Sequence, residues 1–133
     1  MATILASSAA ELPADRARTT TALAPIDTAG FRDSANHWRN IRDTNRFIHA
    51  LPQQPTYRPD QVREIAANIL LFQRENGGWP KDYDMLAILA EEQSATVLAT
   101  KGRHDTSFDN HNAHSQVDYL ARAFAASGEP AWR

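Results

Sequence analysis

The stretch Gln73-Arg74-Glu75-Asn76-Gly77-Gly78-Trp79-Pro80-Lys81-Asp82-Tyr83-Asp84 follows the most apolar run of the chain, residues 65–72. Its two glycines end the preceding helical pattern, because glycine adopts positive φ angles without a Cβ clash. The Trp-Pro step then predicts an extended exit, since the residue before a proline is pushed out of the α region. A large aromatic residue at a rigid turn, followed by a lysine and two aspartates, indicates either a structural plug or the wall of a site.

A strongly apolar helix is predicted before this turn. Pro59 suits the first position of that helix, where its missing N–H costs nothing. One face follows the i, i+3, i+4, i+7 spacing of a helix and consists of Val62, Ile65, Ala66, Ile69 and Gln73. Residues 70–72 make the helix apolar on most sides, so we expect it at the centre of a helical assembly.

Other helices are predicted on both sides of this central one. Residues 91–101 begin with two glutamates, end with a lysine and are stopped by Gly102, which suits the helix dipole. Residues 111–127 form the next helix, and its expected buried face is Val117, Leu120, Ala121 and Phe124. A weaker pattern over 31–51 places Trp38, Ile41 and Ile48 on one face. Residues 85–90 suit a helical turn or an extended segment, and no stretch alternates long enough for a strand, so the predicted class is all-α.

Composition excludes several classes of protein. With 42% hydrophobic and 23% charged residues, the 133-residue chain has the balance of one modest globular domain. A net charge of -2 without a basic stripe gives no case for a nucleic-acid partner. No apolar run is long enough to span a membrane. The absence of cysteine excludes disulfides and thiolate chemistry.

The amino-terminal segment differs in composition from the rest. Residues 1–28 are rich in Ala, Thr and Ser, and Ile4-Leu5-Ala6 is too short for the apolar core of a secretory signal. We therefore predict a flexible tail or linker over residues 1–29 and a helical domain over 30–133, with no clear signal peptide. A remnant of a signal, or a linker after a lost upstream module, is the alternative.

Three stretches together resemble polysaccharide lyase family 10, the pectate lyases with an α/α toroid catalytic domain. They are Phe-Arg-Asp-Ser-Ala-Asn-His-Trp (31–38), the run from Ile65 to Met85, and Ser-Phe-Asp-Asn-His-Asn-Ala-His-Ser-Gln-Val-Asp-Tyr-Leu-Ala-Arg (107–122). The resemblance covers about residues 30–133 and corresponds to the amino-terminal portion of a longer domain. It implies part of an α/α toroid, an incomplete helical barrel, and an extracellular or periplasmic protein.

The resemblance also implies a reaction, the calcium-assisted β-elimination of polygalacturonate (pectate). Calcium takes about 6–8 oxygen ligands, and Asp109 matches the Asp-Asn pair of the family motif as a metal ligand. Asn110 would bind substrate or hold Asp109 in place. The alternative for both is a plain role as helix N-cap. The family's base is an arginine from a later part of the domain that no arginine here matches, so the catalytic residue is unknown and activity of the chain alone is uncertain.

Trp79 and Lys81 are the other candidates for substrate binding. An aromatic face stacks on sugar rings, and a lysine pairs with a uronate carboxylate. The competing interpretation of Trp79 is structural, because Gln73-x-x-x-Gly77-x-Trp79 has the spacing of a motif that ties helix ends together in terpene cyclases, which are also α/α toroids. The roles of His37, His111 and His114 stay open.

Two hypotheses therefore remain at this point. One is a pectate lyase-like protein that is weak or inactive alone. The other is a non-catalytic helical remnant or module, which binds acidic polysaccharide or calcium, or serves only a structural purpose. An incomplete barrel would also leave apolar helix faces uncovered, at roughly 25 cal/mol per Å² of wet apolar area. We therefore expect marginal folding or self-association.

Overall fold

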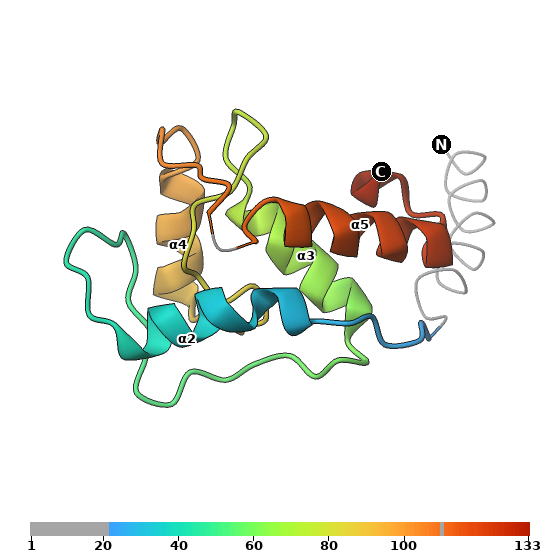
Figure 1. Cartoon of the computed structure of the whole chain (residues 1–133), viewed down its shortest axis with the longest axis horizontal. Helices are drawn as coiled ribbons and strands as arrows, with labels where there is room; N and C mark the ends of the chain where they lie inside the picture. Colours follow the sequence, from blue (N-terminus) through green and yellow to red (C-terminus); the bar gives the residue numbers. More distant parts are fainter. Residues whose placement is uncertain (1–21, 110) are drawn as a thin grey trace, which may run out of the picture.

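The computed structural model describes residues 22–109 and 111–133, and these form four α-helices and two short 3-10 helices without any strand (Figure 1). The predicted all-α class is confirmed. Two isolated antiparallel bridges, Thr56 with Ala87 and Pro80 with Thr106, connect the segments between helices. The arrangement as part of an α/α toroid, an incomplete helical barrel, stays a prediction. No helix of the described part is long and apolar enough to cross a membrane.

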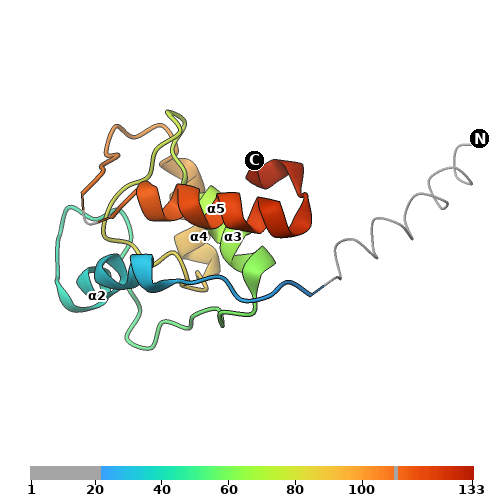
Figure 2. The same ribbon diagram turned by 45° about the vertical axis from the view of Figure 1, so that its right-hand side comes forward.

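Helix α3 (Val62–Phe72) is the central element, and it contacts both α4 (Glu91–Ala99) and α5 (His114–Ser127) (Figures 1 and 2). Four of the five residues predicted for its inner face, from Val62 to Ile69, are at most 1% exposed, so the predicted position at the centre is confirmed. The fifth, Gln73, lies beyond the helix with an extended backbone, so its predicted place on this face is wrong. The predicted start at Pro59 is wrong. Pro59 lies in a turn in which the backbone N–H of Arg58 donates to Oε1 of Gln61 over 2.8 Å, and the helix begins after that turn.

Helix α2 (Arg32–Asn40) follows the short helix η1 (Ala29–Phe31) and is shorter than predicted. Ile41 has an extended backbone and is 51% exposed, so its predicted place on a buried helix face is wrong. The carboxylate of Asp43 accepts the backbone N–H of Asn45 over 2.9 Å, a local turn that competes with helix. Ile48 is buried from the following loop, and its carbonyl accepts the indole N–H of Trp38 over 3.3 Å.

The chain before η1 is described only from residue 22 onward. Residues 22–28 have no regular secondary structure, and Leu23 and Ile26 pack against the core. The side chain of Asp27 accepts the backbone N–H of Ala29 over 2.9 Å, which satisfies one donor at the start of η1. The predicted tail over residues 1–29 otherwise lies outside the described residues.

Helix α5 is present, but it begins at His114 instead of the predicted residue 111, and a different face is buried. Gly128 ends it in the left-handed conformation at φ 72°, as the sequence indicates. Its buried residues are Gln116, Tyr119, Leu120 and Ala123, whereas Val117 is 57% exposed and Ala121 is also exposed. The face turned inward is thus rotated from the predicted one. A glutamine occupies it because Nε2 of Gln116 donates to Oδ1 of Asn112 over 2.7 Å.

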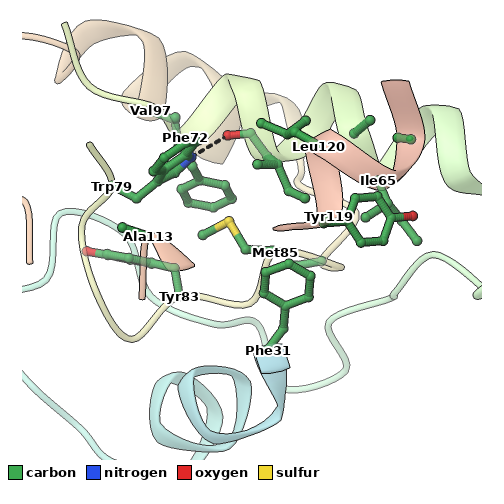
Figure 3. Close-up of a cluster of buried hydrophobic side chains, with 14 of the residues drawn as sticks. Phe31, Ile65, Phe72, Trp79, Tyr83, Met85, Val97, Ala113, Tyr119 and Leu120 are labelled. Carbon is green, nitrogen blue, oxygen red and sulfur yellow. Dashed lines mark hydrogen bonds between the residues drawn. The ribbon is translucent and has the colours of Figure 1, made fainter. Parts of the chain in front are cut away.

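The core continues into the segment after the Gly-Gly-Trp-Pro turn. Residues 85 and 86 form a turn that the backbone N–H of Ala87 closes on the carbonyl of Asp84 over 3.1 Å, and residues 87–90 contain no helix. Met85 and Ala87 are at most 1% exposed. The amide of Asn68 on α3 donates to both of their carbonyls, over 2.8 and 3.0 Å. Figure 3 shows how aromatic side chains from several elements meet around Met85. The segment before α4 therefore lines the core as a single turn followed by non-helical chain, so it matches neither of the two predicted alternatives over its whole length.

Candidate functional site

Two loops lie side by side at one end of α3, and together they carry the residues singled out in the sequence. The first is residues 73–84 and the second is residues 103–113. Pro80 bridges Thr106, and the backbone N–H of Ser107 donates to the carbonyl of Trp79 over 3.1 Å. We call these residues the paired loops. Their backbone contact places two segments about 30 residues apart in the sequence at one edge of the molecule.

Trp79 is a structural residue of the first loop. It is 3% exposed, and its indole N–H donates to the carbonyl of Ile69 over 2.8 Å, as the dashed line in Figure 3 shows. The side chain of Gln73 donates to the carbonyl of Gly77 over 2.8 Å. These two bonds tie the end of α3 to the turn that follows it. The geometry favours the structural interpretation of Trp79 over stacking on a sugar.

Lys81 and Asp109 form an ion pair across the paired loops. Nζ of Lys81 lies 2.9 Å from Oδ2 of Asp109, and the two side chains are 44% and 62% exposed. The hydrogen bond and the charge of Asp109 raise the pKa of Lys81 above its usual value. The structure thus brings these two predicted residues together in contact with solvent. Asn110, predicted beside them, lies outside the described residues.

Asn112 is the residue that sequence reasoning missed. Its side-chain amide is buried and donates to the carbonyls of Trp79 and Ser107 over 2.8 and 2.6 Å. Its backbone N–H donates to the carbonyl of Asp109 over 3.0 Å. This asparagine therefore fixes the second loop against the first and holds Asp109 in position. An asparagine just before a helix resembles an ordinary cap in the sequence, so nothing local distinguishes this role.

Asp82, next to Lys81, is buried at 3% exposure. Its carboxylate lies 3.5 Å from Nε2 of His37 and 3.5 Å from Nη2 of Arg46. The guanidinium of Arg46 also donates to the backbone carbonyl of Asp82 over 2.8 Å. Asp82 thus connects the site to α2 and to the loop after it, and His37 is one of its partners.

Backbone strain gathers in the paired loops. The non-glycine residues with positive φ in the described part of the chain are Asp82, His111 and Ala113, at 67°, 63° and 67°. Such conformations are sparsely populated and persist only where surrounding contacts impose them. All three flank the Lys81–Asp109 pair in sequence. Strained residues cluster at functional sites, so this distribution supports the paired loops as the candidate site.

The paired loops also fall within a recognisable family segment. A family model described as pectic acid lyase matches residues 73–133. This part of the chain is similar to the pectic acid lyases. The resemblance to pectate lyases is therefore confirmed, while the assignment to family 10 stays a prediction. Neither a curated protein nor a solved structure matches the chain.

The pectic acid lyase segment contains the Gly-Gly-Trp-Pro turn, α4, both paired loops and α5. Lys81, Asp109 and the missed Asn112 all lie within it. Helices α2 and α3 precede it. The match thus begins where the central helix ends and includes every predicted site residue.

A calcium site is not formed by the described residues of this segment. Residues 22–109 and 111–133 contain no group of three or more His, Cys, Asp or Glu side chains placed to hold a metal ion. The carboxylate of Asp109 has the ammonium of Lys81 at 2.9 Å, and an ammonium group at that position competes with a cation. One exposed carboxylate supplies too few of the oxygen ligands that calcium takes. The donor set described here does not fit calcium.

Proposed function

We propose that this chain is a pectate lyase-like protein that binds polygalacturonate at the Lys81–Asp109 edge of the paired loops and supports its cleavage by β-elimination. The pectic acid lyase match over residues 73–133 supports this proposal, because it includes both members of the pair. The observation that carries it is the contact of Lys81 and Asp109 at a solvent-exposed position. A lysine held there is available to an acidic polymer.

The chemistry explains why a cation is needed at this position. In β-elimination, a base removes the C5 proton, which is α to the uronate carboxylate, and the electron pair forms a C4–C5 double bond. The C4–O bond breaks, and the glycosidic oxygen leaves with its electrons and takes up a proton. Negative charge develops on the carboxylate during the first step. A positive group beside that carboxylate stabilises the transition state more than the ground state.

Lys81 meets this requirement through an exchange of partners. An exposed ion pair contributes only about 0.2–1 kcal/mol, so replacing Asp109 by a uronate carboxylate costs little. Asp109 then lies next to the bound sugar, where its carboxylate accepts hydrogen bonds from hydroxyl groups. The pair thus keeps the lysine oriented in the free protein and releases it to substrate. We assign no base, and no step depends on calcium.

The experiment compares paired variants on polygalacturonate. Lys81→Met should weaken binding by about five-fold, the effect of losing one exposed charge contact of about 1 kcal/mol. Asp109→Asn frees the lysine and should leave binding equal or tighter. Asp118→Asn is the matched control, because Asp118 forms an exposed pair with Arg122 at 3.0 Å on α5. Binding is measured by calorimetry, and cleavage is followed by ultraviolet absorbance of the unsaturated product.

The outcomes separate cleavage from binding. Product that depends on Lys81 supports the lyase function, and a chelator added to the same assay tests calcium. Binding that depends on Lys81 without product keeps the site and overturns cleavage by this chain. Equal binding by Lys81→Met and the native chain removes Lys81 from the site and overturns the proposal.

A further inference from the structure

A groove lies outside the pectic acid lyase segment, where α2 ends and the following loop begins. In Figure 1 this loop projects from the labelled helix α2 at the left of the view. The groove has a volume of about 510 Å³, within the range of pockets that hold small ligands. Its lining residues are Trp38, Arg39, Asn40, Ile41, Arg42, Thr44, His49 and Ala50. None of these is acidic.

The floor and rim of this groove differ in chemistry. Trp38 is 3% exposed and packs beneath the groove, where its indole N–H donates to the carbonyl of Ile48, so the exposed side chain of Ile41 forms the accessible apolar base. Around them stand arginine, histidine, amide and hydroxyl groups. An apolar base suits the C–H face of a sugar ring, and a polar rim suits its hydroxyl and carboxylate groups. The combination favours a sugar acid over a purely apolar ligand.

The two arginines of the rim differ in whether their charge is paired. Arg39 is anchored, because its guanidinium donates to buried Asp84 over 2.8 Å and to the carbonyl of Gln54 over 3.3 Å. Arg42 is exposed, and within residues 22–109 and 111–133 its guanidinium pairs with no other group. The charge of Arg39 is compensated by Asp84, whereas that of Arg42 is available. Arginine binds a carboxylate through two parallel hydrogen bonds.

The groove is connected to the paired loops through its own loop. Arg46 lies four residues beyond Arg42, and its guanidinium donates to the carbonyls of Lys81 and Asp82 over 3.5 and 2.8 Å. This contact holds the loop of the groove against the loop that carries Lys81. A polymer bound at Lys81 therefore has a second cationic position on the adjacent loop.

We propose that this groove is a second binding site for a carboxylate-bearing sugar, with Arg42 as the residue that pairs with the carboxylate. The choice of a uronate as that sugar rests on the proposed function. The exposed side chain of Ile41 contacts the ring, and Asn40 and Thr44 take hydroxyl groups. The site extends the binding surface for polygalacturonate beyond the pectic acid lyase segment. Neighbouring uronates of one chain then occupy the groove and the Lys81 position.

The test measures the binding of oligogalacturonates of increasing length by the full chain. Arg42→Gln should weaken binding of long oligomers by about five-fold, because one carboxylate contact is lost. Thr44→Glu adds a negative charge at the rim and should have an effect in the same direction. Arg58→Gln is the matched control, since Arg58 is an exposed arginine outside the groove that pairs with Asp60 at 3.1 Å. Circular dichroism verifies that each variant is folded.

The results decide this proposal separately from the proposed function. Weaker binding by Arg42→Gln and Thr44→Glu, with no change for Arg58→Gln, supports the groove. Unchanged binding by both groove variants overturns it, whatever Lys81→Met shows. If binding weakens only with Lys81→Met, the Lys81 site stands and the groove is not a binding site. If binding weakens only with Arg42→Gln, the groove stands and Lys81 is not part of a binding site. Polyglutamate that binds as tightly as polygalacturonate overturns the assignment to a sugar.

Discussion

Arg74 and Asp105 join the two site loops through a two-point ion pair. Nε and Nη2 of Arg74 lie 2.8 and 2.9 Å from the two carboxylate oxygens of Asp105, and Nη1 donates to the carbonyl of Thr100 over 2.6 Å. The side chain of Arg74 is fully buried, whereas that of Asp105 is 27% exposed. A buried arginine with these partners fixes the spacing of the loops that carry Lys81 and Asp109.

Replacing Asp105 by alanine should destabilise the fold strongly. The change leaves the buried guanidinium of Arg74 without its counter-charge, and removing one partner of a buried pair costs about 3 kcal/mol or more. Urea unfolding measures the free energy of unfolding. Asp118→Ala breaks an exposed pair and should cost less than about 1 kcal/mol. Equal losses for the two variants would show that the Arg74–Asp105 pair has no special structural role.

Replacing Ala113 by glycine should increase the stability of the fold. It precedes α5 with φ 67° and ψ -50°, a combination that strains any residue with a Cβ atom. Relief of about 1–3 kcal/mol of strain exceeds the 0.5–1 kcal/mol that a glycine costs through the unfolded chain, so Ala113→Gly should raise the free energy of unfolding. Ala121→Gly on the exposed side of α5 should lower it by about 1 kcal/mol. The idea fails if both substitutions destabilise equally.

The sequence predicts helices well where apolar spacing is local. The inner face of α3 follows from four residues within two turns, and the glycine stop at 128 follows from residue type alone. The spacing between Gln73 and Trp79 likewise indicates the structural role of Trp79. These features depend on neighbours in the chain. Local physics is enough to find them. The predicted stop at Gly102 is wrong, because α4 ends at Ala99 with Thr100 as its C-cap.

The buried face of α5 and the contacts that hold the paired loops together could not be predicted in this way. Val117 looks like a core residue by hydropathy, but the Asn112–Gln116 hydrogen bond places polar groups on the inner face. The Arg74–Asp105 pair spans 31 residues of sequence, and nothing in either segment indicates the other. Local chemistry and the family resemblance indicate Lys81 and Asp109 separately, as a substrate-binding residue and a metal ligand. Their contact depends on how two loops pack.

Two buried tyrosines should make the protein less stable in alkali. Burial raises the pKa of Tyr83 and of Tyr119 to about 12, from the ordinary value near 10. Between about pH 10 and 12 the unfolded chain loses phenolic protons that the folded chain keeps, so stability falls as pH rises through that window. A shift of this size corresponds to about 2–3 kcal/mol for each tyrosine. Urea unfolding from pH 8 to pH 12 measures the loss.

A matched variant isolates the tyrosine contribution. The hydroxyl of Tyr119 is buried and finds no hydrogen-bond partner in the part of the chain that the structure describes. Tyr119→Phe should therefore be nearly neutral at pH 8 and should lose less stability above pH 10. Burial lowers the pKa of Lys101, which contributes in the opposite direction as pH rises. A Tyr119→Phe profile parallel to that of the native chain would contradict the assignment.

The outer face of α5 is apolar and uncovered in the described chain. A groove of about 390 Å³ runs along it and is lined mostly by apolar side chains: Leu70, Trp79, Val117, Leu120, Ala121, Phe124, Ala131 and Trp132, with Gln73 and Arg133. Val117 stands at this groove with 57% of its surface exposed. Apolar area left in water costs roughly 25 cal/mol per Å². This surface is where the self-association predicted from the sequence would take place.

Val117→Asp should reduce self-association because it places a charge in the middle of this apolar face. Sedimentation velocity over a range of protein concentrations should show a mass that rises for the native chain and stays monomeric for the variant. Leu98→Asp is the control: Leu98 on α4 is also 57% exposed but does not line the groove, so its replacement should leave association unchanged. If the native chain is a monomer at every concentration and unfolds in one sharp transition, the uncovered face causes no association and the prediction is wrong.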